Sequence, residues 1–252
     1  MIAQLGMYDW PHMRTKLDAF WSVLREEAAA RGVDLPEHLS HDLPLREVWT
    51  EPDLTIAMCC GWNVVSGEVP EARVFARPDW DHPGHPQGTY HSVMVCRVED
   101  VERPLAELMG RPAANGANSW SGWHLFRHFA AQEGLPLGTP VWSGSHRVSI
   151  KLVLDGKADC AAIDRVSFGL AQALGETDGL VSRAALPAFP STPFIIGPNM
   201  PLAAERSLRD ALNAALKHAG GAPWAEGLGL LSVIETTQQE YHSMRSNLAS
   251  TW

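Results

Sequence analysis

The feature that most constrains this chain is a regular alternation between short apolar runs and amphipathic segments with helical spacing. Strand-like runs occur at residues 2–7, 53–58, 73–76, 90–97, 112–115, 141–143, 159–163, 180–185 and 194–196. Helical segments follow them, among others at residues 105–109, 122–133, 147–154, 203–219 and 238–249. Strands that alternate with helices predict an α/β architecture with mainly parallel sheets.

Size and charge narrow the classes of function. A chain of 252 residues with 45% hydrophobic residues is long enough for one large domain or two smaller lobes. The net charge of −9 argues against a nucleic-acid partner, because phosphate backbones need clustered Lys and Arg. The same charge gives no long-range attraction for a small anion, so local dipoles and hydrogen bonds must capture such a ligand.

The first residues lack the basic start and apolar run of a secretory signal. The chain as written is therefore expected in the cytoplasm, and in the periplasm if a signal has been removed from it. The sequence has no apolar stretch of about 18 residues, so no membrane span is expected.

Cysteine and histidine usage predicts neither a metal nor a cofactor. The four cysteines form no C-x-x-C pair and are expected to be reduced and mostly structural. His38 with His41, and His82 with His85, have i, i+3 spacing but lie in Pro-rich loops without Cys partners, which favours solvated loops over a metal site. Glycine motifs for nucleotides and the G-x-S-x-G motif of hydrolases are absent from the sequence.

Polar, aromatic and glycine residues gather at the predicted carboxyl ends of the strands. In open α/β sheets, ligands bind in the crevice outside those ends, so functional residues are expected there. The positions concerned are Tyr8, Asp9, Cys60, Gly61, residues 118–122, residues 143–146, and Asp164.

Ser119 and Ser121 precede Gly122 and a predicted helix. Unpaired N–H groups and a partial positive charge at a helix N-terminus make an anion site when hydroxyls stand beside it. The alternative is an ordinary N-cap, where Ser is favoured in any case.

His146 and Asp164 also stand at predicted helix starts. A neutral histidine donates one hydrogen bond and a protonated one adds charge, although a structural histidine is the alternative. Asp164 can cap its helix, or it can accept from a ligand cation, which would favour a zwitterionic ligand. Nothing in the spacing supports a hydrolytic triad of Ser121, His146 and Asp164.

Several of these strand ends resemble one family. The resemblance rests on Met-Tyr-Asp at 7–9, Cys-Gly at 60–61, Tyr-His-Ser-Val-Met-Val at 90–95, Asn-Ser-Trp-Ser-Gly-Trp at 118–123, Ser-Gly-Ser-His-Arg at 143–147 and Asp-Gly-Lys-Ala-Asp-Cys-Ala-Ala-Ile-Asp at 155–164. These motifs are similar to those of phosphate/phosphonate-type substrate-binding proteins of ABC transporters, over residues 2–197. The sequence departs from the transporter members of this family in two ways. It lacks a signal peptide, which concerns the transport role, and it has Ser-Trp-Ser at the start of the helix instead of an uninterrupted Ser/Thr run, which concerns phosphonate specificity.

The resemblance implies a type II periplasmic-binding-protein-like fold with two α/β lobes and a hinge of two crossing strands. Lobe 1 would comprise residues 1–89 and 197–252, and lobe 2 residues 90–196, with hinge strands at 90–97 and 190–196. The implied function is a solute-binding protein, without a catalytic residue, that closes on a small anionic or zwitterionic molecule of phosphate or phosphonate type. An ABC transporter permease would be its partner.

The resemblance also implies a set of ligand contacts. Ser119, Ser121 and His146 would hold the anionic end of the ligand, Asp164 and Tyr8 the other end, and Tyr90 would line the hinge. Cys60 belongs to the same implied set. The alternative function is a cytosolic lyase or biosynthetic enzyme on the same scaffold, in which Asp164 or His146 would act as general acid or base.

Overall fold

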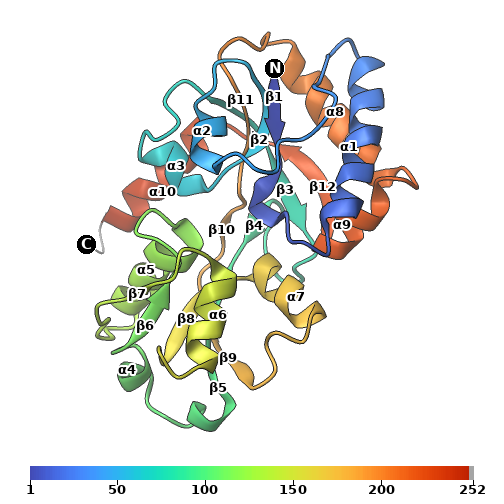
Figure 1. Cartoon of the computed structure of the whole chain (residues 1–252). Coiled ribbons are helices and arrows are strands. Elements are labelled where there is room, and N and C mark those ends of the chain that lie inside the picture. Colours follow the sequence, from blue (N-terminus) through green and yellow to red (C-terminus); the bar gives the residue numbers. More distant parts are fainter. Residues whose placement is uncertain (250–252) are drawn as a thin grey trace. The chain divides into compact units, whose positions relative to one another are not determined.

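The computed structural model describes residues 1–249 and divides the chain into two compact units (Figure 1). Unit 1 comprises Met1–Thr89 and Pro190–Ser243; unit 2 comprises Tyr90–Phe189 and the end of the chain from Met244. The sequence placed residues 190–196 in the second lobe, whereas here they belong to unit 1. Residues 250–252 of the expected first lobe lie outside the described residues.

Unit 1 is built on a sheet with the strand order β1-β2-β11-β3-β12. Its strands are β1 (Ile2–Gln4), β2 (Leu54–Met58), β11 (Phe194–Ile196), β3 (Arg73–Trp80) and β12 (Leu230–Glu235). β1 and β2 are parallel, but β11 runs antiparallel to both of its neighbours and β12 antiparallel to β3. The expectation of mainly parallel sheets is therefore wrong, because the chain re-enters unit 1 late and inserts β11 against the direction of β2 and β3.

Three of the helices of unit 1 pack against one another. The helices of unit 1 are η1 (Gly6–Tyr8), α1 (Arg14–Ala29), α2 (Leu45–Trp49), α3 (Gly61–Val65), α8 (Ala204–Lys217) and α9 (Ala222–Leu228). Helix α10 (Gln238–Ala249) begins in unit 1 and passes Ser243, the last residue of that unit, so its later residues belong to unit 2 and not to the first lobe as the sequence predicted. Leu17, Phe20 and Leu24 recur at helical spacing on α1 and are buried, and α1 contacts α8 and α9, as Figure 1 shows. The rings of Phe20 and Trp224 lie 4.4 Å apart in this core.

Unit 2 is built on a second mixed sheet, with the order β7-β6-β8-β5-β9. Its strands are β5 (Ser92–Arg97), β6 (Pro112–Ala114), β7 (Val141–Trp142), β8 (Cys160–Asp164) and β9 (Leu180–Ala185). β6 is parallel to β7 and β8, whereas β5 is antiparallel to β8 and β9. The helices are η2 (Val98–Asp100), α4 (Leu105–Leu108), η3 (Trp120–His124), α5 (Leu125–Gln132), α6 (His146–Leu154) and α7 (Arg165–Ala173).

Two short strands, β4 (Thr89–Tyr90) and β10 (Phe189–Pro190), pair where the chain passes from one unit to the other. The expected strand at 90–97 is thus divided between β4 and β5. β3 runs on to Trp80, beyond the predicted start of a loop at residue 78, because Pro78 still lies opposite Val233 of β12. The sequence reading missed β12 and the short helices α2, α3 and α9.

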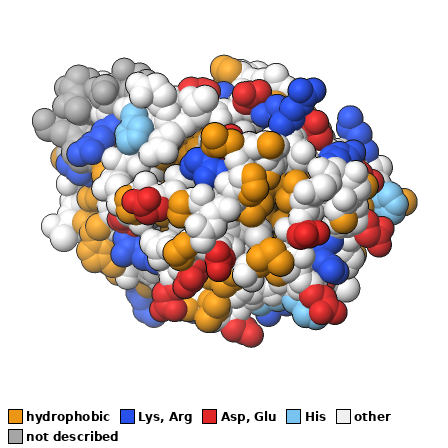
Figure 2. Space-filling model, turned by 90° about the horizontal axis from the view of Figure 1, so that it is seen from above, with side chains coloured by type: hydrophobic (Ala, Val, Ile, Leu, Met, Phe, Trp, Pro, Cys, Tyr) orange, Lys and Arg blue, Asp and Glu red, His pale blue; other side chains and the backbone are white. Residues whose placement is uncertain are grey.

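The surface carries charges of both signs. On the face that Figure 2 presents, acidic and basic side chains are interspersed with apolar ones, without a continuous basic patch. Within residues 1–249, no helix combines the length and the apolar character that crossing a bilayer requires.

Candidate functional site

Three parallel strands of unit 2 end at one edge of the sheet, and a helix follows each of them. β6 leads to η3, β7 to α6, and β8 to α7. Ser121 is the second residue of η3, His146 is the first residue of α6, and Asp164 is the N-cap of α7. Because helix N-termini carry a partial positive charge, this edge of unit 2 favours an anion.

These three side chains contact one another and form what we call the Ser121–His146–Asp164 cluster. Ser121 Oγ lies 2.9 Å from His146 Nε2, and the same nitrogen lies 3.2 Å from Asp164 Oδ2. Ser121 and Asp164 are buried, with exposed fractions of 6% and 3%. No spacing in the sequence would join the three residues; the structure brings their side chains into contact.

Asp164 also caps a helix. Its Oδ1 accepts a hydrogen bond from the backbone N–H of Ser167 at 2.9 Å, while Oδ2 faces His146. The capping role that the sequence offered as one alternative is therefore present. Contact between Asp164 and a ligand stays a prediction.

The position of the proton on His146 follows from its neighbours. A carboxylate can only accept, so His146 Nε2 carries a hydrogen and donates it toward Asp164. Burial lowers the pKa of His146, and the raising effects of the Asp164 charge and the Ala162 backbone are smaller than that of burial. His146 is therefore a neutral imidazole near neutral pH. A protonated Nε2 has no lone pair, so the Ser121 hydroxyl cannot donate to it, which leaves the hydroxyl hydrogen for another acceptor.

The same geometry argues against nucleophilic catalysis. In a hydrolytic triad the serine bonds Nε2 and the aspartate bonds Nδ1, so that the ring accepts the serine proton while the aspartate orients it. Here Ser121 and Asp164 both lie at Nε2 of His146. With its one hydrogen on Nε2 directed at Asp164, the ring has no lone pair on that nitrogen to accept the Ser121 proton, so it cannot act as the base for Ser121.

Close packing around Gly122 shapes the cluster. Ser119 is the N-cap of η3 and accepts from the Gly122 N–H at 3.1 Å, so its capping role is present and its ligand contact stays a prediction. A Cβ on Gly122 would lie 1.9 Å from Asn115 Oδ1 and 3.1 Å from His146 Cε1. Glycine at this position lets η3 approach β6 and α6.

Sequence reasoning missed two residues that support the cluster. Asn115 packs against Gly122, and its position directly after β6 was the available signal. Ser92 Oγ donates to the backbone carbonyl of Ser121 at 3.0 Å and so holds the start of η3. Ser92 belongs to the Tyr-His-Ser-Val-Met-Val motif at 90–95, but no role was assigned to it from the sequence.

The remaining predicted contacts lie elsewhere in the chain. Tyr8 ends η1 in unit 1 and is 2% exposed, with its ring edge-on to Trp80 at 5.5 Å. Cys60 is the half-buried N-cap residue of α3, also in unit 1. Tyr90 is buried on β4, at the first position of unit 2. Ligand contacts by these three residues stay predictions.

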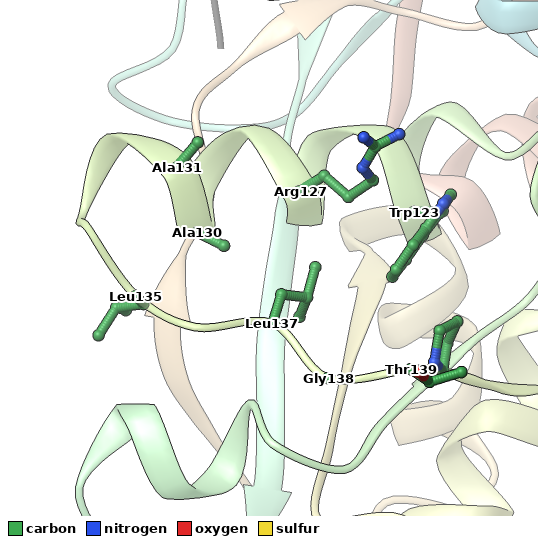
Figure 3. A pocket seen from close by; sticks show the side chains of 9 residues that line it. Trp123, Arg127, Ala130, Ala131, Leu135, Leu137, Gly138 and Thr139 are labelled. Carbon is green, nitrogen blue, oxygen red and sulfur yellow. The ribbon is translucent and has the colours of Figure 1, made fainter. Parts of the chain in front are cut away.

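A hollow of about 430 Å³ lies on unit 2 between α5 and the segment that precedes β7 (Figure 3). Figure 3 shows Trp123 and Arg127 extending from the helix, with Leu137 and Thr139 on the segment below. The Arg127 guanidinium lies 5.9 Å from the centroid of the Trp123 ring, and Trp142 meets that ring edge-on. The hollow is lined by none of the predicted ligand residues.

In the first histidine pair, His41 is held between two carboxylates. His41 Nδ1 lies 2.7 Å from Asp9 Oδ2, and its Nε2 lies 2.9 Å from Asp18 Oδ1. His38 is strongly exposed, close to Glu37. Across residues 1–249, the His, Cys, Asp and Glu side chains make no group of three or more that could hold a metal ion.

Residues 51–241 match the model of a protein family. That family is described as the periplasmic substrate-binding proteins of phosphonate ABC transporters. A search of the curated proteins gave no match.

Solved structures share the fold at low sequence identity. A PhnD1 protein from Prochlorococcus marinus in complex with methylphosphonate is 17% identical, with a TM-score of 0.74, over 97% of this chain and 96% of that one. A binding-protein component of an ABC phosphonate transporter from Pseudomonas aeruginosa is 14% identical, with a TM-score of 0.72, over 98% and 84%. A Xanthomonas citri protein bound to ATP is 12% identical, with a TM-score of 0.70, over 99% and 98%. The expected fold class, that of two-lobed α/β periplasmic binding proteins, is confirmed.

Proposed function

The chain belongs to the family of periplasmic substrate-binding proteins of phosphonate ABC transporters, and from this premise we propose that it binds a small organic oxyanion at the Ser121–His146–Asp164 cluster. The family and the structural neighbours are substrate-binding proteins, so the chain has a solute-binding role and the alternative of a lyase is not favoured. The residues and the ligand are the subject of the proposal.

One observation carries the choice of residues. His146 Nε2 lies within hydrogen-bond distance of both Ser121 Oγ and Asp164 Oδ2, and the hydrogen that Asp164 requires on this nitrogen leaves the Ser121 hydroxyl hydrogen to be donated to a ligand. Three helix N-termini stand at the same sheet edge and add partial positive charge. A tetrahedral or planar oxyanion matches such a set of donors and dipoles. With a net charge of −9, the chain needs this local attraction, because its overall field repels anions.

The ligand we propose is a phosphonate-like molecule, anionic or zwitterionic. Ser119, Ser121 and His146 would hold its anionic end. Asp164, which lies beside that end, favours a ligand that also carries a cation. Tyr8, Cys60 and Tyr90 complete the proposed set of contacts, as the family resemblance implies.

The proposed partner is the permease of an ABC transporter, and the proposed place of action is the periplasm. Both follow from the description of the family, whose members deliver solutes to such transporters. The proposal predicts that the ligand passes from this chain to the permease without chemical change.

The test is calorimetric titration with methylphosphonate, 2-aminoethylphosphonate, inorganic phosphate and sulfate. Ser121→Ala removes one donor to a charged ligand, which is worth about 1.5–3 kcal/mol, or about 10–100-fold in affinity. Ser22→Ala is the matched control, because Ser22 lies exposed on α1 and donates only to the Asp18 carbonyl.

We expect weaker binding by Ser121→Ala and unchanged binding by Ser22→Ala. Circular dichroism of both variants checks that the fold is kept. Unaltered affinity in Ser121→Ala would remove the cluster from the site. Failure of all four probes to bind would overturn the ligand class.

A further inference from the structure

Two of the four cysteines face each other across neighbouring strands of unit 2. Cys96 on β5 lies directly opposite Cys160 on β8 in the antiparallel register, and both side chains are fully buried. Both are free thiols in the structure, and Cys160 Sγ donates to the Leu108 carbonyl at 3.2 Å. The other two cysteines, Cys59 and Cys60, belong to unit 1.

Opposed positions on antiparallel strands have the geometry that a disulfide needs. Their side chains project from the same face of the sheet, and their Cα atoms are about 4.5 or about 5.5 Å apart, depending on the type of pair. Disulfides accept Cα separations of about 4.4–6.8 Å, so either type of pair fits. Their Cβ atoms, about 4.5–5.5 Å apart before bonding, need to approach by about 1 Å at most.

Cys96 lies close enough to Cys160 to contribute to the raised pKa of Cys160. Burial is the main cause that raises the pKa of Cys160, and Cys96 is among the groups that raise it further. Burial likewise raises the pKa of Cys96. Both thiols of the folded protein therefore stay protonated and shielded from reagents, and they react while the sheet is still open.

We propose that Cys96 and Cys160 form a cross-strand disulfide when the chain folds in an oxidising compartment. The oxidant is an external disulfide, of a protein or of oxidised glutathione. One cysteine thiolate attacks a sulfur of that disulfide and releases its first thiolate; the second cysteine thiolate then attacks the mixed disulfide and releases the other. Two thiols lose two protons and two electrons, and the external disulfide becomes two thiols.

Two features support this modification. The family to which the chain belongs is described as periplasmic, and the bacterial periplasm is oxidising. The bond would also fix the register between β5 and β8, and therefore the position of Asp164, which is the last residue of β8. A slip of one residue would turn every side chain of β8 to the other face of the sheet. The inference does not depend on which ligand the protein binds.

The experiment begins with the reduced, denatured full chain, refolded in a mixture of oxidised and reduced glutathione. The protein is then denatured again without reductant, and its free thiols are counted. We expect two free thiols instead of the four in the sequence, and a mass lower by about 2 Da for the two lost hydrogens. Peptide mapping should link Cys96 to Cys160. Four free thiols, or a bond between another pair, would overturn the proposal.

Matched variants assign the bond. The double variant Cys59→Ser/Cys60→Ser should show the same mass loss and no free thiols. Cys96→Ala, and independently Cys160→Ala, should show three free thiols and no mass loss. A mass loss that persists in Cys96→Ala would mean that a different pair is linked. Reduction of the refolded wild-type chain should lower its melting temperature by roughly 5–15 °C.

Discussion

At the scale of single residues, the arrangement around one nitrogen atom distinguishes binding from catalysis. Ser121 and Asp164 both meet His146 at Nε2, and the single hydrogen on that nitrogen, directed at Asp164, leaves no lone pair for the Ser121 proton. Asp164 fixes the proton on that nitrogen, and burial keeps the ring neutral by lowering its pKa. The Ser121 hydroxyl is thereby oriented without the ring becoming a base.

Asp164→Asn tests this arrangement. The introduced amide can still cap α7, because Asn is as good an N-cap as Asp. Unlike the carboxylate, the amide does not require a hydrogen on His146 Nε2. This nitrogen can then accept a hydrogen bond from the Ser121 hydroxyl, which turns the hydroxyl hydrogen away from the ligand. We expect affinity for methylphosphonate to fall about tenfold or more, since a charge-assisted hydrogen bond is worth about 1.5–3 kcal/mol.

Titration of two ligands separates the possible roles of Asp164. An equal loss for methylphosphonate and 2-aminoethylphosphonate supports the proton-fixing role. A larger loss for 2-aminoethylphosphonate indicates that Asp164 also meets the ligand cation, as the sequence suggested. Unchanged affinity for both ligands would exclude either role. Asp155→Asn is the control, because it removes a charge from unit 2 outside the cluster, where Asp155 pairs with lysines.

At the scale of elements, His41 ties helix α1 to the segment that precedes it. Its two ring nitrogens lie at Asp9 and Asp18, both of them carboxylates, so both nitrogens must donate and the ring must be cationic. Arg14 of α1 pairs with the same Asp9. Because Asp9 follows Tyr8, this group of charges also holds the end of η1.

The contacts of His41 with Asp9 and Asp18 predict that the stability of the protein depends on pH. Burial lowers the pKa of His41, but its hydrogen bonds to Asp9 and Asp18 and their charges outweigh burial, so the pKa lies above the ordinary 6.5. A group whose pKa is higher in the folded than in the unfolded protein stabilises the folded state. This stabilisation is complete when the pH is below the pKa of the unfolded state, and it is lost as the pH rises through the pKa of the folded state. The difference in unfolding free energy between wild type and His41→Gln should therefore be largest below about pH 6.5 and shrink at higher pH.

Urea unfolding of both proteins from about pH 5 to about pH 9 measures this difference. His38→Gln is the matched control, because His38 is strongly exposed and belongs to the same loop. If the difference in unfolding free energy between wild type and His41→Gln is constant with pH, or grows as pH rises, the proposed role of His41 is wrong.

At the scale of the whole molecule, ligand binding and stability are linked. A ligand that binds only the folded protein at about 100 times its Kd adds about 2.7 kcal/mol to the unfolding free energy. For a chain of this size, that corresponds to a rise of about 5–10 °C in melting temperature. We expect this rise with the best phosphonate, and a smaller rise for Ser121→Ala at the same ligand concentration. Differential scanning calorimetry provides the measurement, and an equal rise in both proteins would disagree with the proposed site.

Much of the element order could be predicted from the sequence, because hydrophobic periodicity is a local property of the chain. The strands at 180–185 and 194–196 and the helix at 238–249 were predicted with the bounds that the structure has. Short elements such as α2 and α3 were missed, since five residues give too little periodicity to recognise. The direction of β11 was also missed, because the pairing of strands depends on residues distant in sequence.

For the candidate site, the sequence by itself determined which positions are candidates: serines, a histidine and an aspartate at helix starts after strands. Capping preferences and strand ends are local signals, so these positions could be named without a structure. Only the tertiary structure decided that Ser121, His146 and Asp164 form one cluster, and that serine and aspartate share a single ring nitrogen. The pairing of β6 with β7 and β8 brings three helix starts together, and no local pattern encodes the side-chain geometry that results.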